Sequence, residues 1–95
     1  MVIYLTVNLI TGEMYIGKDV KNRKNYFGSG IAFKSAIKKY SKEAFYKFII
    51  DKANTKEELC KKEKYWIKYY NTFWGRGYNL TPGGDGGDTW KHIQK

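Results

Sequence analysis

The sequence of 95 residues has a single cysteine, few acidic side chains and no long apolar run. Cys60 has no second cysteine to pair with, so an internal disulfide is excluded and a reducing cytoplasm is the expected location. Lysines and polar residues interrupt every apolar stretch, and none approaches the roughly 20 residues that a membrane-spanning helix needs. Met1 leads directly into a predicted strand, so no secretory signal is visible. What remains is one small globular domain with a single modest core.

Acidic residues are outnumbered by basic ones. Eighteen Lys and Arg against nine Asp and Glu leave a formal net charge of +9, which indicates a polyanionic partner. Nucleic acid is favoured, because phosphates bind dispersed cations with release of counterions, and aromatic-rich basic domains suit nucleotide surfaces. An anionic membrane is a weaker alternative, since no helix combines a basic face with a broad apolar one. The simplest alternative is that the lysines only keep a small domain soluble.

The first 18 residues predict a β-hairpin. Two runs rich in β-branched and aromatic residues, 2–8 and 13–18, flank a polar break that carries Gly12. Each run carries a tyrosine, Tyr4 on the first and Tyr15 on the second. Taken singly, each is most simply an amphipathic core residue whose hydroxyl reaches the edge of the sheet.

The middle of the chain predicts a loop, a helix and a strand. Residues 19–30 are rich in Lys, Arg, Asn and Gly and form a basic loop, a common place for chemistry beside a rigid hairpin. Residues 31–40 have apolar positions at helical spacing, with lysines facing outward. The short aromatic run 44–50 predicts a third strand, with a helix as the alternative because so short a run has no clear period.

The last helix is predicted to begin at Lys56. Thr55 and Glu58 form a capping box, in which the threonine hydroxyl and the glutamate satisfy free backbone N–H groups at the helix start. Asn71 is a suitable end. Beyond the helix, the glycine-rich residues 81–95 are predicted to be a linker or tail, which leaves residues 1–80 as the domain proper.

Glu63 lies in the middle of the apolar stripe of this helix. Burying a carboxylate there costs several kcal/mol, on the order of magnitude, unless a cation or donor meets it. One explanation is a salt bridge to a lysine or arginine of the sheet. The other is a metal site, since Mg²⁺ is commonly held by one carboxylate, waters and substrate phosphates. The apolar residues on the same face are Leu59, Cys60, Trp66 and Ile67, three or four positions away, and Tyr70, seven positions away.

Five sequence elements together resemble the GIY-YIG nuclease domain, and the resemblance covers about residues 2–80. A Tyr-Phe-Gly-Ser-Gly run and a late Gly-Gly-Asp-Gly-Gly run look most like the phage-type homing and seg-like members. In chain order, the five elements are Tyr4, Tyr15-Ile16-Gly17, the loop arginine Arg23, Glu63 within Glu63-Lys64-Tyr65-Trp66-Ile67, and Gly77-Tyr78-Asn79.

The resemblance implies an α+β fold, a small three-stranded antiparallel sheet flanked by helices, and metal-dependent hydrolysis of DNA phosphodiesters. It implies a single divalent ion, Mg²⁺ or Mn²⁺, held by Glu63. It also places the two tyrosines together on the sheet, an arginine on the scissile phosphate and an asparagine that supports the site. The catalytic residues so predicted are Tyr4, Tyr15, Arg23, Glu63 and Asn79, and the weaker DNA contacts are Lys18, Lys21, Lys24 and Lys34.

The chain departs from the family pattern at two places. Val2 stands where the family has its first glycine, and a strand start accepts valine. The register of the family's arginine falls on Asn25, so Arg23 comes two residues early. Either the loop is reshaped so that Arg23 reaches the phosphate, or Lys18 or Lys24 makes this contact, or the domain is impaired. No histidine lies between the second strand and the first helix, where some members have one.

The first hypothesis is therefore a Mg²⁺-dependent endonuclease domain acting on double-stranded DNA, a monomer in isolation, in a bacterial or phage-infected cell. Because tyrosine has a pKa of about 10, catalysis by a phenol needs nearby cations or a path for its proton. Tyr4 is favoured as the hydroxyl nearest the attacking water, with Tyr15 supporting it. The alternatives are a catalytically impaired nucleic-acid-binding module and a basic domain that binds an acidic protein.

Overall fold

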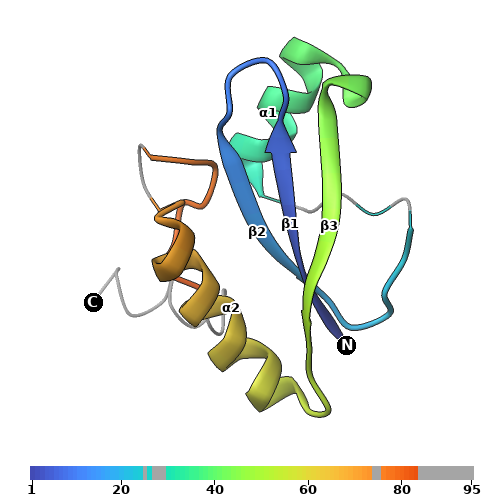
Figure 1. Ribbon diagram of the computed structural model, residues 1–95, viewed down its shortest axis with the longest axis vertical. Helices are drawn as coiled ribbons and strands as arrows, with labels where there is room; N and C mark the ends of the chain where they lie inside the picture. The colour runs from blue at the N-terminus through green and yellow to red at the C-terminus, as the bar shows by residue number, and fades with distance from the viewer. Residues whose placement is uncertain (25, 27–29, 74–75, 84–95) are drawn as a thin grey trace.

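The computed structural model describes residues 1–24, 26, 30–73 and 76–83. Three antiparallel strands form a sheet with β1 (Val2–Asn8) at its centre, β2 (Met14–Asp19) on one side and β3 (Phe45–Lys52) on the other. Figure 1 shows this order and the helices on either face. The predicted third strand is thus confirmed, and the second strand begins one residue later than expected.

Two helices cover opposite faces of the sheet. Side chains alternate along β1, so Ile3 and Leu5 point to one face and Tyr4 to the other. The first face packs on α2 (Lys56–Tyr70), and the second face packs on α1 (Ile31–Tyr40). A short 3₁₀ turn, η1 (Lys42–Ala44), joins α1 to β3. The two cores consist of Ile3, Leu5, Ile16, Ala53, Leu59 and Ile67, and of Phe33, Ala36, Phe45 and Tyr78.

The hairpin turn fixes the register of β1 against β2. The Asn8 side-chain oxygen accepts hydrogen bonds from the backbone N–H groups of Ile10 and Thr11, at 2.9 and 3.3 Å. Gly12 has a φ of 82°, in the left-handed region that glycine adopts without strain. This turn sets Tyr4 directly opposite Gly17 on β2.

The ends of α2 are formed by the residues predicted to form them. The Thr55 hydroxyl accepts a hydrogen bond from the Glu58 backbone N–H at 3.1 Å. Glu58 accepts in return from the backbone of Asn54, at 3.3 Å, one residue earlier than a capping box requires. Asn71 ends the helix in the left-handed conformation, with a φ of 56°. The start at Lys56 is therefore confirmed.

The segment after α2 returns to the sheet. The Tyr78 backbone N–H donates to the Met14 carbonyl of β2 at 2.9 Å. Gly77 makes this approach possible, because a Cβ there would stand 2.6 Å from the same carbonyl oxygen. Residues 81–83 continue this segment, whereas residues 84–95 of the predicted linker lie outside the described residues.

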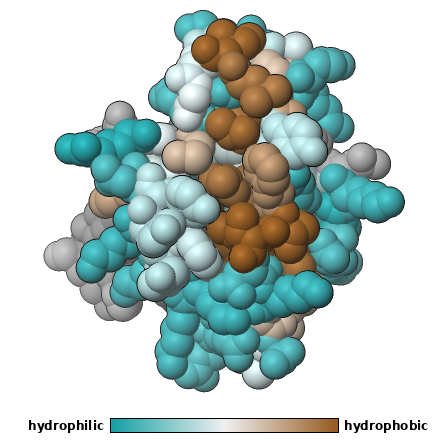
Figure 2. Space-filling view, viewed as in Figure 1, coloured by the Kyte–Doolittle hydropathy of each residue, from teal (hydrophilic) through white to brown (hydrophobic). Residues whose placement is uncertain are grey.

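The face of the sheet that packs on α2 is only partly covered. The helix lies over β2 and β1 and reaches β3 only at its end, where Trp66 and Lys62 contact Asp51. Tyr46 and Phe48, nearer the start of β3, are about half exposed, with their rings 4.7 Å apart. Figure 2 shows apolar residues running across the face of the molecule seen in this view. In the part of the chain described, no helix combines the length and apolar character needed to cross a membrane.

We expect Thr55→Ala to lower the free energy of unfolding by about 1 kcal/mol, because the Glu58 backbone N–H would lose its partner. Urea denaturation followed by circular dichroism measures the loss. Ser35→Ala is the matched control, since it removes a hydroxyl from an exposed interior position of α1. It should leave the stability equal or slightly higher because alanine favours helices. Equal stability of Thr55→Ala and wild type would contradict a capping role.

Candidate active site

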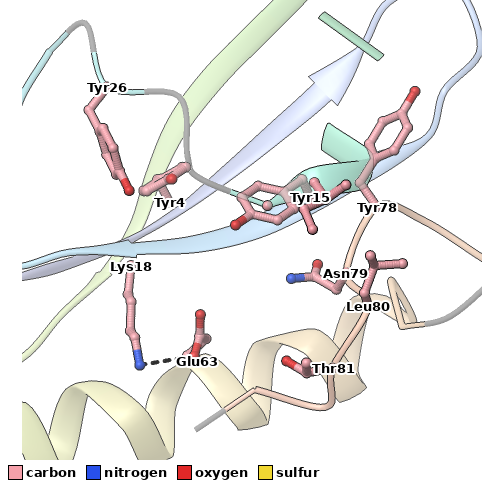
Figure 3. A pocket seen from close by; sticks show the side chains of 11 residues that line it. Tyr4, Tyr15, Lys18, Tyr26, Glu63, Tyr78, Asn79, Leu80 and Thr81 are labelled. Atoms are coloured by element: carbon pink, nitrogen blue, oxygen red, sulfur yellow. Dashed lines mark ion pairs between the residues drawn. The ribbon is translucent and has the colours of Figure 1, made fainter. Parts of the chain in front are cut away.

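A cavity of about 490 Å³ lies beside β2, between α2 and the start of α1. Figure 3 shows its two walls: Tyr26, Tyr4 and Tyr15 form a row on one side, and Lys18 and Glu63 lie opposite. The segment after α2 closes one end with Asn79, Leu80 and Thr81. Two of these tyrosines, the lysine, the glutamate and the asparagine are sequence-predicted site residues that the fold brings together.

Tyr4 reaches this cavity from the central strand because Gly17 has no side chain. A Cβ at Gly17 would collide with the ring carbons and hydroxyl of Tyr4. The ring centroid of Tyr4 lies 6.4 Å from that of Tyr15 and 6.3 Å from that of Tyr26. Tyr4 is fully buried, so it forms the back of the cavity, while Tyr15 and Tyr26 are partly exposed.

Tyr15 is held by α1. Its ring stacks on Phe33, with centroids 4.6 Å apart and planes 9° from parallel. The N-cap residue of the helix, Gly30, forms a backbone hydrogen bond with the Tyr15 hydroxyl. A Cβ at Gly30 would lie 3.1 Å from the Tyr15 ring, so a larger residue would push the ring out of place. The tyrosine is therefore positioned by the entry into α1 as well as by β2.

The buried carboxylate of α2 has the cation that its position required. Lys18 Nζ lies 3.4 Å from Glu63 Oε1 and also donates to Cys60 Sγ at 3.4 Å. The Glu63 side chain is only 12% exposed. Burial alone would lower the pKa of Lys18, but the charge of Glu63 and the contact with Cys60 raise it above its usual value. The expected salt bridge to the sheet is confirmed, with Lys18 as the partner.

Both predicted tyrosines are protonated at neutral pH in the free domain. Burial, reinforced by Tyr15, Tyr26 and nearby carboxylates, raises the pKa of Tyr4 well above its usual value. Burial, reinforced by the charge of Glu63, raises the pKa of Tyr15 to about 12. In this state the phenols are hydrogen-bond donors, and either could act as a base only after cations enter the cavity.

Asn79 joins the last segment to β2. Its side-chain oxygen accepts from the Ile16 backbone N–H at 2.9 Å and from the Thr72 hydroxyl at 2.7 Å. Its amide nitrogen donates to the Ile16 carbonyl at 2.9 Å. The side chain thus takes the place of a further strand at the edge of the sheet, next to Tyr15. This is the geometry of a residue that supports the site.

Arg23 lies outside the cavity. Its guanidinium donates to the buried carboxylate of Asp19, with Nη2 3.1 Å from Oδ1, and its carbon lies 4.0 Å from the centre of the Tyr26 ring. Asp19 also accepts from the backbone N–H groups of Lys21 and Arg23. Burial alone would raise the pKa of Asp19, but the hydrogen bonds from Arg23 and Lys21 hold it below its usual value. Of the weaker candidates, Lys18 lines the cavity, whereas Lys21, Lys24 and Lys34 are exposed elsewhere.

The residues of the cavity fit a hydrated divalent ion held by one carboxylate. Glu63 offers hard oxygen ligands beside open space, which suits Mg²⁺ with waters and a substrate phosphate completing its shell. Among the described residues there is no group of three or more His, Cys, Asp and Glu side chains that would make an all-protein cage. The predicted single-carboxylate site therefore has a place in the fold.

Sequence reasoning missed Tyr26, which lines the cavity, and Lys47, which lies next to it. Lys47 Nζ lies 4.5 Å from the centre of the Tyr4 ring and donates to the carbonyls of Arg23 and Tyr26. A tyrosine within a basic loop was the available signal for Tyr26. Nothing in the sequence marks Lys47, because only strand pairing brings it opposite Thr6 and above the loop.

A solved structure identifies the fold class of this domain. The catalytic domain of intron endonuclease I-TevI, in a glutamate-to-alanine variant, matches with a TM-score of 0.68 and 25% sequence identity. The match covers 84% of this chain and 92% of that domain. The three-stranded antiparallel sheet with two helices is thus the fold of the GIY-YIG nuclease domain. No family model matches the sequence.

Proteins of similar sequence show which endonucleases this chain is related to. "Putative endonuclease segE" of Enterobacteria phage T4 is 40% identical over 87 residues, which are 90% of this chain and 42% of that protein. "Putative endonuclease segD" of the same phage is 34% identical over 94 residues, which are 97% of this chain and 42% of that protein. The chain is homologous to the phage T4 seg endonucleases, and its fold matches the GIY-YIG catalytic domain of I-TevI. It spans about two fifths of their length.

We expect Gly17→Ala to be more destabilising than Gly12→Ala, although Gly12 is the one with positive φ. A methyl group at Gly17 displaces the Tyr4 ring, while at Gly12 it meets open space and costs only backbone strain of about 1–2 kcal/mol. Thermal unfolding compares the two. The effect of Gly17→Ala should shrink in a Tyr4→Ala background, because the collision is then absent. Full additivity of the two changes would show that Gly17 does not accommodate Tyr4.

We expect acid to destabilise the domain through Asp19. Because the folded pKa is lowered, the contribution of Asp19 is complete above its unfolded pKa of about 3.9 and is lost as pH falls through the lower folded value. Asp19→Asn should therefore be less stable at pH 7 and lose less stability below about pH 4. Urea melts across this range measure both. Glu57→Gln, an exposed change, should leave the wild-type pH dependence intact. An unchanged acid slope in Asp19→Asn would contradict the assignment.

Proposed function

We propose that this domain is the catalytic part of a homing-type endonuclease, which hydrolyses phosphodiester bonds of double-stranded DNA with one Mg²⁺ or Mn²⁺ ion. The observation that carries the proposal is the pairing of one buried carboxylate with a lysine across a cavity from a row of phenols. Phosphodiester hydrolysis needs an oriented water, donors for the developing negative charge and help for the leaving 3′ oxygen. The net charge of +9 suits a DNA substrate.

Glu63 would hold the metal ion, because it is the carboxylate that lines the cavity. A bound ion would supply Lewis-acid stabilisation of the phosphate and a more acidic water. Lys18 Nζ lies 3.4 Å from this carboxylate and can turn to the phosphate oxygens. Since Lys18 lines the cavity and Arg23 does not, we assign the scissile-phosphate contact to Lys18, one of the alternatives that the sequence left open.

The tyrosines would act first as donors. Tyr15 is partly exposed, and its hydroxyl can donate to a phosphate oxygen or orient a water molecule. Tyr4 is fully buried behind it, so burial favours Tyr15 as the hydroxyl in contact with substrate and Tyr4 as its support. This reverses the order that the sequence alone favoured. Asn79 would keep β2, and therefore Tyr15, in place through its two bonds to Ile16.

A second candidate function is a DNA-binding module without cleavage. One observation favours it: Arg23, at the loop position nearest to the family arginine, is engaged by Asp19 outside the cavity. The two functions differ in whether DNA is cut, and a cleavage assay distinguishes them.

We expect Glu63→Gln to lower the rate of plasmid cleavage at least about 100-fold, because the change removes the charged carboxylate that would hold the divalent ion. Supercoiled plasmid is incubated with Mg²⁺, Mn²⁺ or EDTA, and nicked and linear forms are quantified. The matched control is Glu57→Gln on the same helix, whose carboxylate is 81% exposed, and it should cut like wild type.

Two outcomes would decide against the nuclease proposal. Cleavage by Glu63→Gln at the wild-type rate would remove the carboxylate from the reaction. Failure of the wild-type domain to cut DNA with any divalent ion, while it still binds DNA, would favour the binding module.

A further inference from the structure

The rings of Tyr4 and Tyr26 line the candidate active-site cavity, and each ring also makes a cation–π contact with a basic side chain. Arg23 lies 4.0 Å from the centre of the Tyr26 ring, and Lys47 Nζ lies 4.5 Å from that of Tyr4. Neither cation lines the cavity that contains Glu63. The two tyrosines therefore form a partition, with the carboxylate on one side and the two cations on the other.

The cations border a second depression, of about 390 Å³, which we name the basic site. Its lining contains three cationic side chains and no acidic one among the described residues. The Arg23 side chain is 53% exposed and Lys24 is exposed, so an anion can reach both from solvent. The basic site is lined by Asn22, Arg23, Lys24, Lys47 and Ile49.

Two anchors hold the loop that carries these cations. Asp19 accepts hydrogen bonds from the backbone N–H groups of Lys21 and Arg23 and from the Arg23 guanidinium. Lys47 Nζ, reaching from β3, donates to the carbonyls of Arg23 at 2.9 Å and Tyr26 at 2.7 Å. Arg23 and Lys47 are thus placed before any ligand arrives, which lowers the entropy cost of binding.

The charge in the basic site is not balanced by Asp19 alone. One carboxylate faces three cations, Arg23, Lys24 and Lys47. Burial lowers the pKa of Lys47, the charge of Asp19 opposes this, and the positive charge of Arg23 adds a smaller lowering. Asp19 engages Nε and Nη2 of Arg23, and a guanidinium has five N–H donors, so donors remain for a second anion.

We propose that the basic site binds a backbone phosphate of DNA that flanks the scissile phosphate. The inference rests on the proposed function. A strand whose scissile phosphate lies between Lys18 and Tyr15 would continue past the Tyr4 and Tyr26 rings to Arg23 and Lys24. Arg23 then fixes the register of the DNA on the enzyme and does not touch the reacting phosphate. Arg23, displaced from the family position, would thus contact the flanking phosphate instead of the scissile one.

The first test is the salt dependence of DNA binding. Wild type and the double variant Arg23→Gln/Lys24→Gln are titrated with a fluorescent duplex in EDTA over a series of KCl concentrations. The slope of log K against log [salt] should fall in magnitude by about 0.9, the value for one phosphate contact. Lys24→Gln alone should show part of this loss and, as an exposed change, it should fold like wild type. The control pair Lys56→Gln/Lys61→Gln removes two exposed lysines of α2 outside both sites and should keep the wild-type slope.

The second test locates the phosphate. Duplexes that carry one neutral methylphosphonate linkage, placed at successive positions around the mapped cleavage site, are compared for affinity. Wild type should lose affinity at one linkage beside the scissile one, and Arg23→Gln/Lys24→Gln should lose no more there, because the contact is already absent.

Three outcomes would overturn the inference in different ways. A salt slope and affinity equal to those of the control pair would show that the basic site does not contact DNA. A lower slope, with the affinity loss located at the scissile linkage itself, would place Arg23 on the scissile phosphate. A wild-type domain that neither binds nor cuts DNA would overturn the proposed function as well, whereas the first two outcomes leave that function standing.

Discussion

The contact between Tyr4 and Gly17 is the constraint on which the site depends. Tyr4 belongs to the central strand, and its neighbour β2 stands between it and the cavity. The Tyr4 ring can cross β2 only because position 17 is a glycine, since a Cβ there would collide with the ring. The Tyr4 ring then limits where Tyr15 and Tyr26 can pack, since the centroids of both rings lie within 6.4 Å of its own. The glycine of the Tyr-Ile-Gly motif is thus explained by packing rather than by backbone conformation.

The same edge of β2 is held from its open side by the last segment. An edge strand exposes backbone donors and acceptors, and Asn79 satisfies both groups of Ile16. Gly77 allows the segment to come close enough. The cavity is therefore bounded by parts of the chain that are far apart in sequence: the hairpin, the start of α1, α2 and the segment after it. Each contributes residues to a site that no single element contains.

The local patterns of the sequence were sufficient for the elements of the fold. Alternation and β-branched residues predicted the strands, and the Thr55 cap and Asn71 stop predicted the limits of α2. The position of Glu63 on an apolar stripe required a cation nearby, and Lys18 supplies it. These features are predictable because each depends on residues within a few positions, or on a single electrostatic cost that must be met.

The sequence by itself determined which chemical groups the domain has: the motif tyrosines, one carboxylate on the inner face of a helix, and a loop of cations. Only the tertiary structure decided which of them share a cavity. It buries Tyr4 behind Tyr15, and the charge of Asp19 draws Arg23 away from the carboxylate of α2. It also brings Lys47 from β3 to the loop that precedes α1. Such choices depend on long-range pairing and buried charge, which no local pattern records.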